Sequence, residues 1–286
     1  MIPEKIRTHL RSLGIASTLR YNLALLRAST RSNYFGMRPR RGAVRNSLGL
    51  ARVLSLKDPS GHLFTGSMNT SLKQDQDVAT TLTTLCQLGL VPHEGREKNW
   101  DAFRAYSFIL THGDRRTAVL DMGSATYGVI LPWLHLYGWR DLHGCDLSFA
   151  QPFHRANIQY TRQNIEHTNY PAARFDFVTC LSVIEHGVNL ERFFREASRV
   201  LKPGGHLLLS TDYWCEPLLT EARYDPVYDC PLKLFSKEDV PLLLRTASAF
   251  GFRPTEPIDP SCEEKVVYWE RVDLRYTFLF LAFSRS

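Results

Sequence analysis

Short apolar runs alternate with amphipathic segments from Thr117 onward, and this alternation constrains the fold more than any other feature of the sequence. Repeated strand–helix units are typical of a mainly parallel sheet covered by helices, so the fold class is α/β. The runs predict seven strands, over residues 118–122, 142–146, 158–160, 175–181, 206–211, 265–269 and 276–283. Apolar spacing predicts helices over 129–137, 190–201 and 236–250, the last with Ser236 as its N-cap. The tetrapeptide KPGG, residues 202–205, predicts a turn before the fifth strand.

The N-terminal part of the chain has a different texture. Residues 1–28 have helical spacing of their apolar positions, and residues 30–66 are expected to be irregular. Residues 72–90 predict a helix closed by Gly89, and a second helix is expected from about Asn99 to Leu110. We therefore expect a basic extension and helical cap over 1–98 and one α/β domain over 99–286.

Charge is concentrated in this extension. Residues 1–50 hold ten Lys or Arg and one acid, a net charge of +9, whereas the whole chain carries +6 and the other 236 residues therefore carry −3. A basic segment can contact nucleic acid, an anionic membrane surface or a phosphorylated substrate, and it can equally be a solvated helix that wraps the domain. It also has the composition of a mitochondrial presequence, although we read it as part of the mature protein. Because the body is acidic, we expect a cap, a dimer contact or a handle for an anionic acceptor or membrane surface.

Composition excludes several classes of protein. The chain is 44% hydrophobic and 22% charged, which excludes disordered and fibrous proteins. No apolar run approaches the ~18 residues of a membrane span. None of the six cysteines forms a CxxC pair, and the histidines do not lie beside them at zinc-ligand spacing. We therefore expect a cytoplasmic chain with reduced thiols and no structural metal.

Three groups of residues that could bind a ligand or take part in catalysis fall at predicted strand ends, where open α/β sheets bind ligands. The run VLDMGSATYG, residues 119–128, lets the backbone approach a ligand closely. Asp146 ends the next strand, where an acid can accept two hydrogen bonds from a ribose or simply cap a helix. The run FDFVTCLSVIEH, residues 175–186, precedes the KPGG turn.

Taken together and in this order, VLDMGSA, GCDLS, FDFVTCLSVIEH and RVLKPGGHLLLS resemble the class I S-adenosylmethionine-dependent methyltransferases, in the type 11/23-like branch that modifies small molecules. The matched stretch, residues 117–212, is about a third of the chain. The resemblance implies a Rossmann-like, seven-stranded, mainly parallel sheet with the last strand antiparallel and helices on both faces. It also implies S-adenosylmethionine as cofactor, with S-adenosylhomocysteine as product.

The resemblance implies roles for individual residues. Residues that line the methionine part of the cofactor are Asp121, Gly123, Ser124 and Ala125, with the Leu181 backbone at the amino group. Asp146 takes the ribose and Leu147 lies beside the adenine, whose edge is formed by Asn164 and Ile165.

Three positions depart from the family pattern. Ala125 and Asn164 replace a glycine and an aspartate, and Ser182 replaces a glutamate that some quinone O-methyltransferases use beside a metal. We therefore predict no metal.

Methyl transfer from a sulfonium needs alignment and, for a hydroxyl acceptor, a base. His186 near the reacting end is the first candidate and Asp212 the second, with the alternative that His186 only hydrogen-bonds backbone or cofactor. Residues 213–235 are expected to form a lid over the acceptor, or to pack as an aromatic-rich loop. The predicted acceptor-site side chains are Trp100, Tyr106, Tyr213, Trp214, Tyr224 and Tyr228.

The leading functional hypothesis is O-methylation of a small molecule, either a sugar-containing metabolite or a natural-product hydroxyl. RNA methylation through the basic arm is an alternative, although the sequence has no recognisable RNA-binding module and no Asn-Pro-Pro-Tyr-type motif. A non-catalytic binding protein on this fold is another, because of Ala125 and Asn164. An NAD-dependent oxidoreductase is disfavoured because the loop lacks GxGxxG. We expect no nucleic-acid partner and no transmembrane segment, and a homodimer is one arrangement that would use the arm.

Overall fold

A computed structural model describes residues 56–218, 224–225, 230–231 and 233–286. The predicted helix over 1–28, the basic arm over 1–50 and Tyr228 lie outside these residues. Within them no helix is both long and apolar enough to cross a membrane.

The described residues form one large, mostly parallel sheet with the order β1-β13-β7-β6-β2-β3-β5-β4, which confirms the predicted α/β class. Its central strands β2, β3, β5, β6 and β7 run parallel to one another, while β13 runs antiparallel to β7 and β4 antiparallel to β5. The bounds along this path are β1 (Thr70–Ser71), β2 (Ala118–Met122), β3 (Asp141–Cys145), β4 (Phe153–Arg155), β5 (Ile158–Thr161), β6 (Phe175–Leu181), β7 (Leu201–Trp214) and β13 (Leu274–Arg285). The carboxyl ends of the parallel strands therefore meet at one edge.

Short strands account for the difference between the seven predicted strands and the eleven that the described part of this sheet contains. Off the main path, β10 (Phe235–Ser236) pairs with β7, and both β11 (Phe252–Pro254) and β12 (Val267–Trp269) pair with β13. A separate pair consists of β8 (Tyr224–Asp225) and β9 (Cys230–Pro231). The four additional strands are β1, β4, β10 and β11, each of two or three residues, which is too short for an alternating pattern. Strand β12 lies within the predicted strand over 265–269.

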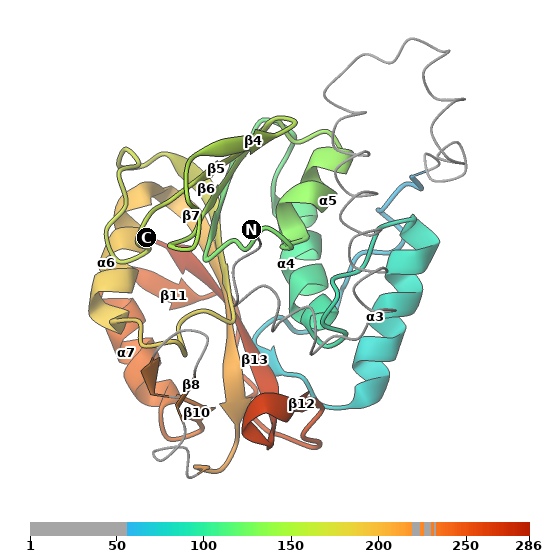
Figure 1. The fold of residues 1–286 in the computed structure, drawn as a ribbon, viewed down its shortest axis with the longest axis vertical. Coiled ribbons are helices and arrows are strands. Elements are labelled where there is room, and N and C mark those ends of the chain that lie inside the picture. The colour runs from blue at the N-terminus through green and yellow to red at the C-terminus, as the bar shows by residue number, and fades with distance from the viewer. Residues whose placement is uncertain (1–55, 219–223, 226–229, 232) are drawn as a thin grey trace, which may run out of the picture.

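Helices cover both faces of the sheet, as predicted (Figure 1). One face carries α3 (Asp75–Leu88), α4 (Lys98–His112) and α5 (Ile130–Leu136), and the other carries α6 (Leu190–Val200) and α7 (Val240–Ala249). Gly89 ends α3 in a left-handed conformation with φ 71°, as its position predicts. A short 3-10 turn, η2 (Glu270–Val272), precedes β13.

Two boundaries differ from the prediction by four residues or more. Helix α7 begins at Val240 rather than at Ser236, because Ser236 pairs with Trp214 in β10 and its hydroxyl donates to Asp239 at 2.9 Å. Strand β7 begins at Leu201, and residues 202–205 bulge out of it, because Phe175 pairs with Leu201 but Phe177 pairs with His206.

No helix covers the described segments on either side of β5. Residues 146–157 connect β3 to β5 through the edge strand β4, and residues 162–174 lead directly to β6. The first hydrophobic core still reaches this half of the sheet, through Ile158 and Tyr160 of β5. Trp100, Tyr106 and Trp133 belong to the core under α4, while Phe193 and Phe194 belong to the core under α6.

Candidate functional site

The turn after β2 is held in a conformation that only glycine tolerates. Gly123 has φ 80°, and a Cβ at this residue would lie 2.4 Å from Cγ2 of Val183. The N–H groups of Gly123 and Ser124 both donate to the Cys145 carbonyl, at 2.9 and 3.0 Å. The turn is thus fixed between the end of β3 and the Val183 side chain that follows β6.

Ala125, where the family pattern has a glycine, causes no backbone strain. It is absent from the residues with positive φ, and its carbonyl accepts a hydrogen bond from Gly128 N at 2.9 Å. The replacement is therefore compatible with a cofactor loop.

Asp121 is a buried carboxyl beneath this turn. It is 7% exposed and accepts a 2.6 Å hydrogen bond from the Thr179 hydroxyl. Burial raises the pKa of Asp121 to about 6, against the opposing effect of hydrogen bonds from Thr179 and from Ser124. A buried carboxylate of this kind is suited to pair with a cationic ligand group.

The residues predicted to hold the adenosine follow the ends of β3 and β5. Asp146 accepts a 2.7 Å hydrogen bond from Ser148 N, so one carboxylate oxygen already holds a turn. Leu147 is 59% exposed, and Ile165 is buried. The side-chain oxygen of Asn164 accepts from Glu166 N at 2.9 Å, so in this structure it serves its own turn.

Strand β6 ends in a strained residue. Leu181, which is half-buried, is followed by Ser182 with φ 52°, a left-handed conformation that is uncommon for a residue with a Cβ. The Ser182 N–H lies 3.0 Å from the Ser210 carbonyl and 3.1 Å from its hydroxyl. The Ser182 hydroxyl oxygen is buried without a hydrogen-bond partner among the described residues. Unpaired buried groups and strain of this kind concentrate at ligand sites.

The segment after Ser182 carries a group of buried acids that the motifs only partly indicated. Glu185 is 1% exposed, and it accepts from the Thr211 hydroxyl at 3.2 Å and from Asp212 N at 3.3 Å. Burial, followed by the charge of Asp212, raises the pKa of Glu185 well above its usual range. Asp212 is 4% exposed, and Lys98 Nζ lies 3.9 Å from its Oδ1. His186 follows directly, in a turn in which its N–H donates to the Val183 carbonyl at 3.1 Å.

Two further charged residues beside these acids come from α4. Asp101 is 1% exposed and accepts a 2.7 Å hydrogen bond from the Ser210 hydroxyl, and Lys98 faces Asp212. Sequence reasoning missed both. The available signal was one acid within an apolar helix, and first-turn acids are common without any site.

The predicted acceptor-site aromatics are not brought together. Trp100 and Tyr106 are buried in the core under α4, where Tyr106 packs against Trp133 with ring centroids 5.8 Å apart. Tyr213 is buried on the opposite face, and its hydroxyl donates to the Pro260 carbonyl at 2.8 Å. Trp214 is partly buried with Lys265 Nζ 4.8 Å from its ring centroid. Only the backbone of Tyr224, in β8, is described.

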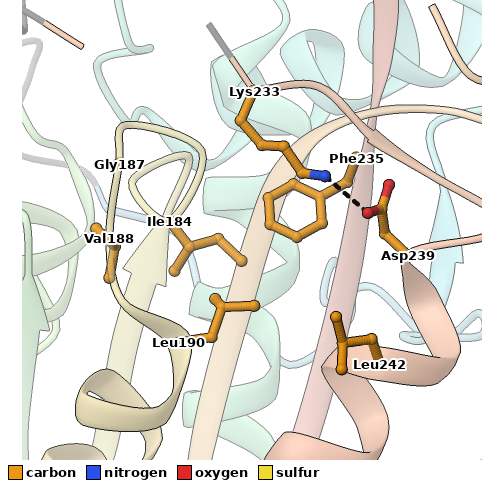
Figure 2. A pocket seen from close by; sticks show the side chains of 8 residues that line it. All are labelled: Ile184, Gly187, Val188, Leu190, Lys233, Phe235, Asp239 and Leu242. Atoms are coloured by element: carbon orange, nitrogen blue, oxygen red, sulfur yellow. Dashed lines mark hydrogen bonds and ion pairs between the residues drawn. The ribbon is translucent and has the colours of Figure 1, made fainter. Parts of the chain in front are cut away.

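An apolar hollow of about 210 Å³ lies beside the loop that carries Glu185 and His186 (Figure 2). Its walls come from that loop and from the start of α7, and an ion pair of 2.7 Å joins Lys233 to Asp239 at one side. The lining residues are Ile184, Gly187, Val188, Leu190, Lys233, Phe235, Asp239 and Leu242. Among the described residues, no group of three or more His, Cys, Asp or Glu side chains could hold a metal ion.

These features fit the cofactor that the motifs imply. Val183 packs directly against the Gly123 turn, and the buried Asp121 and the unpaired Ser182 hydroxyl lie beside it, where the motifs place the methionine part of the cofactor.

Comparison with known proteins gives a family. The sequence profile of the methyltransferase domain matches residues 93–247, which is more than half of the 286 residues. A ubiquinone biosynthesis O-methyltransferase from Coxiella burnetii is 40% identical over 55 residues, which is 19% of this chain and 24% of the relative. A tRNA U34 carboxymethyltransferase from Campylobacter curvus is 34% identical over 65 residues, 23% of this chain and 22% of the relative. The chain thus spans about a quarter of the length of these curated relatives.

Among solved structures, an S-adenosylmethionine-dependent methyltransferase from Mesorhizobium loti aligns with a TM-score of 0.46 at 19% identity, over 66% of this chain and 98% of that one.

Proposed function

The chain belongs to the methyltransferase domain family, the class of S-adenosylmethionine-dependent enzymes that its motifs resemble, and we propose that it methylates a hydroxyl group of a small molecule. The observation that carries this proposal is the contact between Val183 and Gly123. It fixes the cofactor turn directly against the segment that bears Glu185 and His186, so cofactor and base candidates share one sheet edge.

The cofactor supplies an activated methyl group. On the proposed assignment, Asp121 attracts its cationic methionine end while Gly123, Ser124, Ala125 and the Leu181 backbone enclose it. Toward the other end, Asp146, Leu147, Asn164 and Ile165 hold the adenosine. The chain's main contribution to rate is then alignment, because the displacement must occur in line.

A hydroxyl acceptor must also lose its proton. We assign His186 as the base that accepts this proton as the new oxygen–methyl bond forms, because an imidazole titrates near neutral pH. Asp212 is the second candidate. Its neighbour Glu185 has a raised pKa, so this buried pair resists carrying two negative charges, and Lys98 offsets one of them.

The hollow beside His186 supports a small acceptor with an apolar portion, such as a natural-product phenol or a sugar-containing metabolite. Its volume of about 210 Å³ suits a ring or a short branched chain rather than a polymer. The lid over 213–235 remains part of this proposal, since Lys233 and Phe235 of that segment line the hollow. The O-methyltransferase named among the relatives supports oxygen as the methylated atom.

RNA methylation is the second candidate, supported by the tRNA-modifying relative and by the charge of +9 over residues 1–50. If the arm binds phosphates, turnover must fall steeply with salt. We favour the other uses of the 1–98 extension, as a cap, a dimer contact or a membrane handle, because the body carries −3.

Isothermal titration of the full chain with S-adenosylmethionine tests the cofactor, and absence of binding would leave only a non-catalytic binding protein. Methyl transfer from radiolabelled cofactor to panels of phenols, sugars and total tRNA, each at low and high salt, then tests the acceptor. Labelling of a small hydroxyl compound at both salt concentrations supports the proposal. Salt-sensitive labelling of tRNA alone refutes it.

A further inference from the structure

The turn at Ser182 depends on support from outside its own loop. Its φ of 52° costs about 1 kcal/mol relative to ordinary backbone for a non-glycine residue. Its N–H is the group that anchors the turn to β7, shared between the Ser210 carbonyl at 3.0 Å and the Ser210 hydroxyl at 3.1 Å. The Ser210 hydroxyl contributes to this anchor only while it presents a lone pair, and not its hydrogen, to the Ser182 N–H.

The Ser210 hydroxyl is oriented by Asp101. A serine hydroxyl has one hydrogen and rotates freely, so its acceptor side is fixed only when that hydrogen is engaged. Here the hydrogen is donated to Oδ2 of Asp101 at 2.7 Å, and Ser210 is fully buried, so water does not compete. The lone pairs consequently face Ser182.

Asp101 is well placed to act as a fixed acceptor. It lies in the first turns of α4, 109 residues before Ser210, and its Oδ1 accepts from Ala102 N at 2.7 Å. Both carboxylate oxygens thus accept. An asparagine cannot do this, because its amide nitrogen would donate toward Ser210 and turn the hydroxyl hydrogen toward the Ser182 N–H.

The Ser182 turn also positions the proposed cofactor loop at Gly123. Val183 directly follows Ser182, and its Cγ2 occupies the space immediately beside Gly123. A shift of the Ser182 turn would move Val183, and the Gly123 turn would lose the side chain against which it packs.

We propose that Asp101 is a positioning residue that fixes the Ser182 turn through the Ser210 hydroxyl and thereby sets the shape of the cofactor loop. The connection runs from α4 on one face of the sheet to Ser210 within β7, and from there to the ends of β6 and β2. The inference rests on the proposed function only for its consequence for the cofactor, since the hydrogen-bond relay itself is a property of the protein alone.

The first experiment measures S-adenosylmethionine affinity by titration calorimetry for the full chain and for D101N, S210A and the double variant. Each single change should weaken binding about tenfold, the loss expected for one misdirected buried hydrogen bond, and the double variant should lose no more than either single one. Thr277→Val is the matched control, since it deletes another buried hydroxyl, which donates to the Leu72 carbonyl at 2.6 Å, and its affinity should stay unchanged. Losses that multiply in the double variant, or wild-type affinity in D101N, would overturn the relay.

The second experiment does not depend on the cofactor. Amide hydrogen exchange of the unliganded protein should accelerate at least fivefold in peptides covering 181–187 for both D101N and S210A, while peptides from α6 beyond Leu190 keep wild-type rates. Unchanged exchange at 181–187 refutes the inference. If the wild type binds no S-adenosylmethionine, the proposed function fails, and the exchange measurement still decides the relay.

Discussion

Val183 occupies the space that a side chain on Gly123 would need, with its Cγ2 2.4 Å from the ideal Cβ position. Gly123→Ala should therefore abolish S-adenosylmethionine binding in calorimetry and lower the melting temperature, because steric conflict adds to the strain of φ 80°. Gly204 separates the two effects, since it has φ 78° but no atom within 4 Å of a Cβ. Gly204→Ala should cost only about 1 kcal/mol of stability and leave binding intact. Equal losses in the two variants would contradict the role of Val183.

Asp121 should make cofactor affinity pH-dependent. Its pKa of about 6 means that it becomes protonated as the pH falls through that value, so its attraction for a cationic methionine group is lost there. Titrations between pH 5 and 8 should show the dissociation constant rising below pH 6. Asp121→Asn should bind weakly throughout and show a flat profile over the same range, and a wild-type slope in that variant would reject the assignment.

The same raised pKa predicts how the stability of the unliganded protein changes with pH. Because folding raises the pKa of Asp121, its contribution is greatest at low pH and is lost as the pH rises through about 6. Asp121→Asn should therefore be more stable than the wild type at pH 7.5, by up to about 3 kcal/mol, with a smaller difference at pH 4.5. Chemical denaturation at the two pH values measures this. An equal destabilisation at both would indicate that the carboxylate is instead paired in the folded chain.

His186→Gln should lower turnover by about 10²-fold or more, while S-adenosylmethionine affinity changes little, if this residue accepts the acceptor's proton. Steady-state rates with a hydroxyl acceptor from the panel, combined with calorimetry, separate the two quantities. His154→Gln, at an exposed position in β4, is the control for a histidine away from the site. Retention of full turnover by the first variant would transfer the role of base to Asp212.

Replacement of Arg104 should lower the free energy of unfolding and leave S-adenosylmethionine binding unchanged. Its guanidinium lies 3.8 Å from the Phe64 ring centroid and 4.2 Å from that of Trp100, and it donates to the Ser67 carbonyl at 2.8 Å. Burial lowers the pKa of Arg104 to about 9. A lysine cannot reproduce the planar stack, so Arg104→Lys should lose about 1–3 kcal/mol in denaturation. The exposed Arg253→Lys should lose almost nothing, and similar losses in both would argue against the stacked geometry.

Local pattern was sufficient for the regular elements. Strands β2 and β6 have the predicted bounds, and α3 and α4 lie within three residues of theirs, because each buries a continuous apolar run or stripe. The sequence does not predict β11, because three residues are too few to show a period. It predicts Ser236 as an N-cap because the pairing of Ser236 with Trp214 is a tertiary contact that the sequence does not show.

The residues of the candidate site also fall into two classes: those that the local sequence predicts and those that only tertiary contacts place. Gly123 and Asp121 follow from the strand that precedes them, since the carboxyl end of a parallel strand is a fixed place in the fold. Asp101 and Lys98 do not, because the burial of a charged residue depends on tertiary contacts between α4 and strands more than 100 residues later. The interior positions of Trp100 and Tyr106 likewise depend on which face of α4 meets the sheet.

Strand β13 pairs with β7 along eight positions and also with β1, β11 and β12. It is the last described strand to be synthesised, so β1 cannot join the sheet until Leu279 and Phe280 have left the ribosome, and Asp212 cannot pair until Phe278 has done so. Until then the Asp212 edge of β7 has no partner strand. The order of synthesis therefore makes pairing beside Asp212 a late event in the formation of this fold.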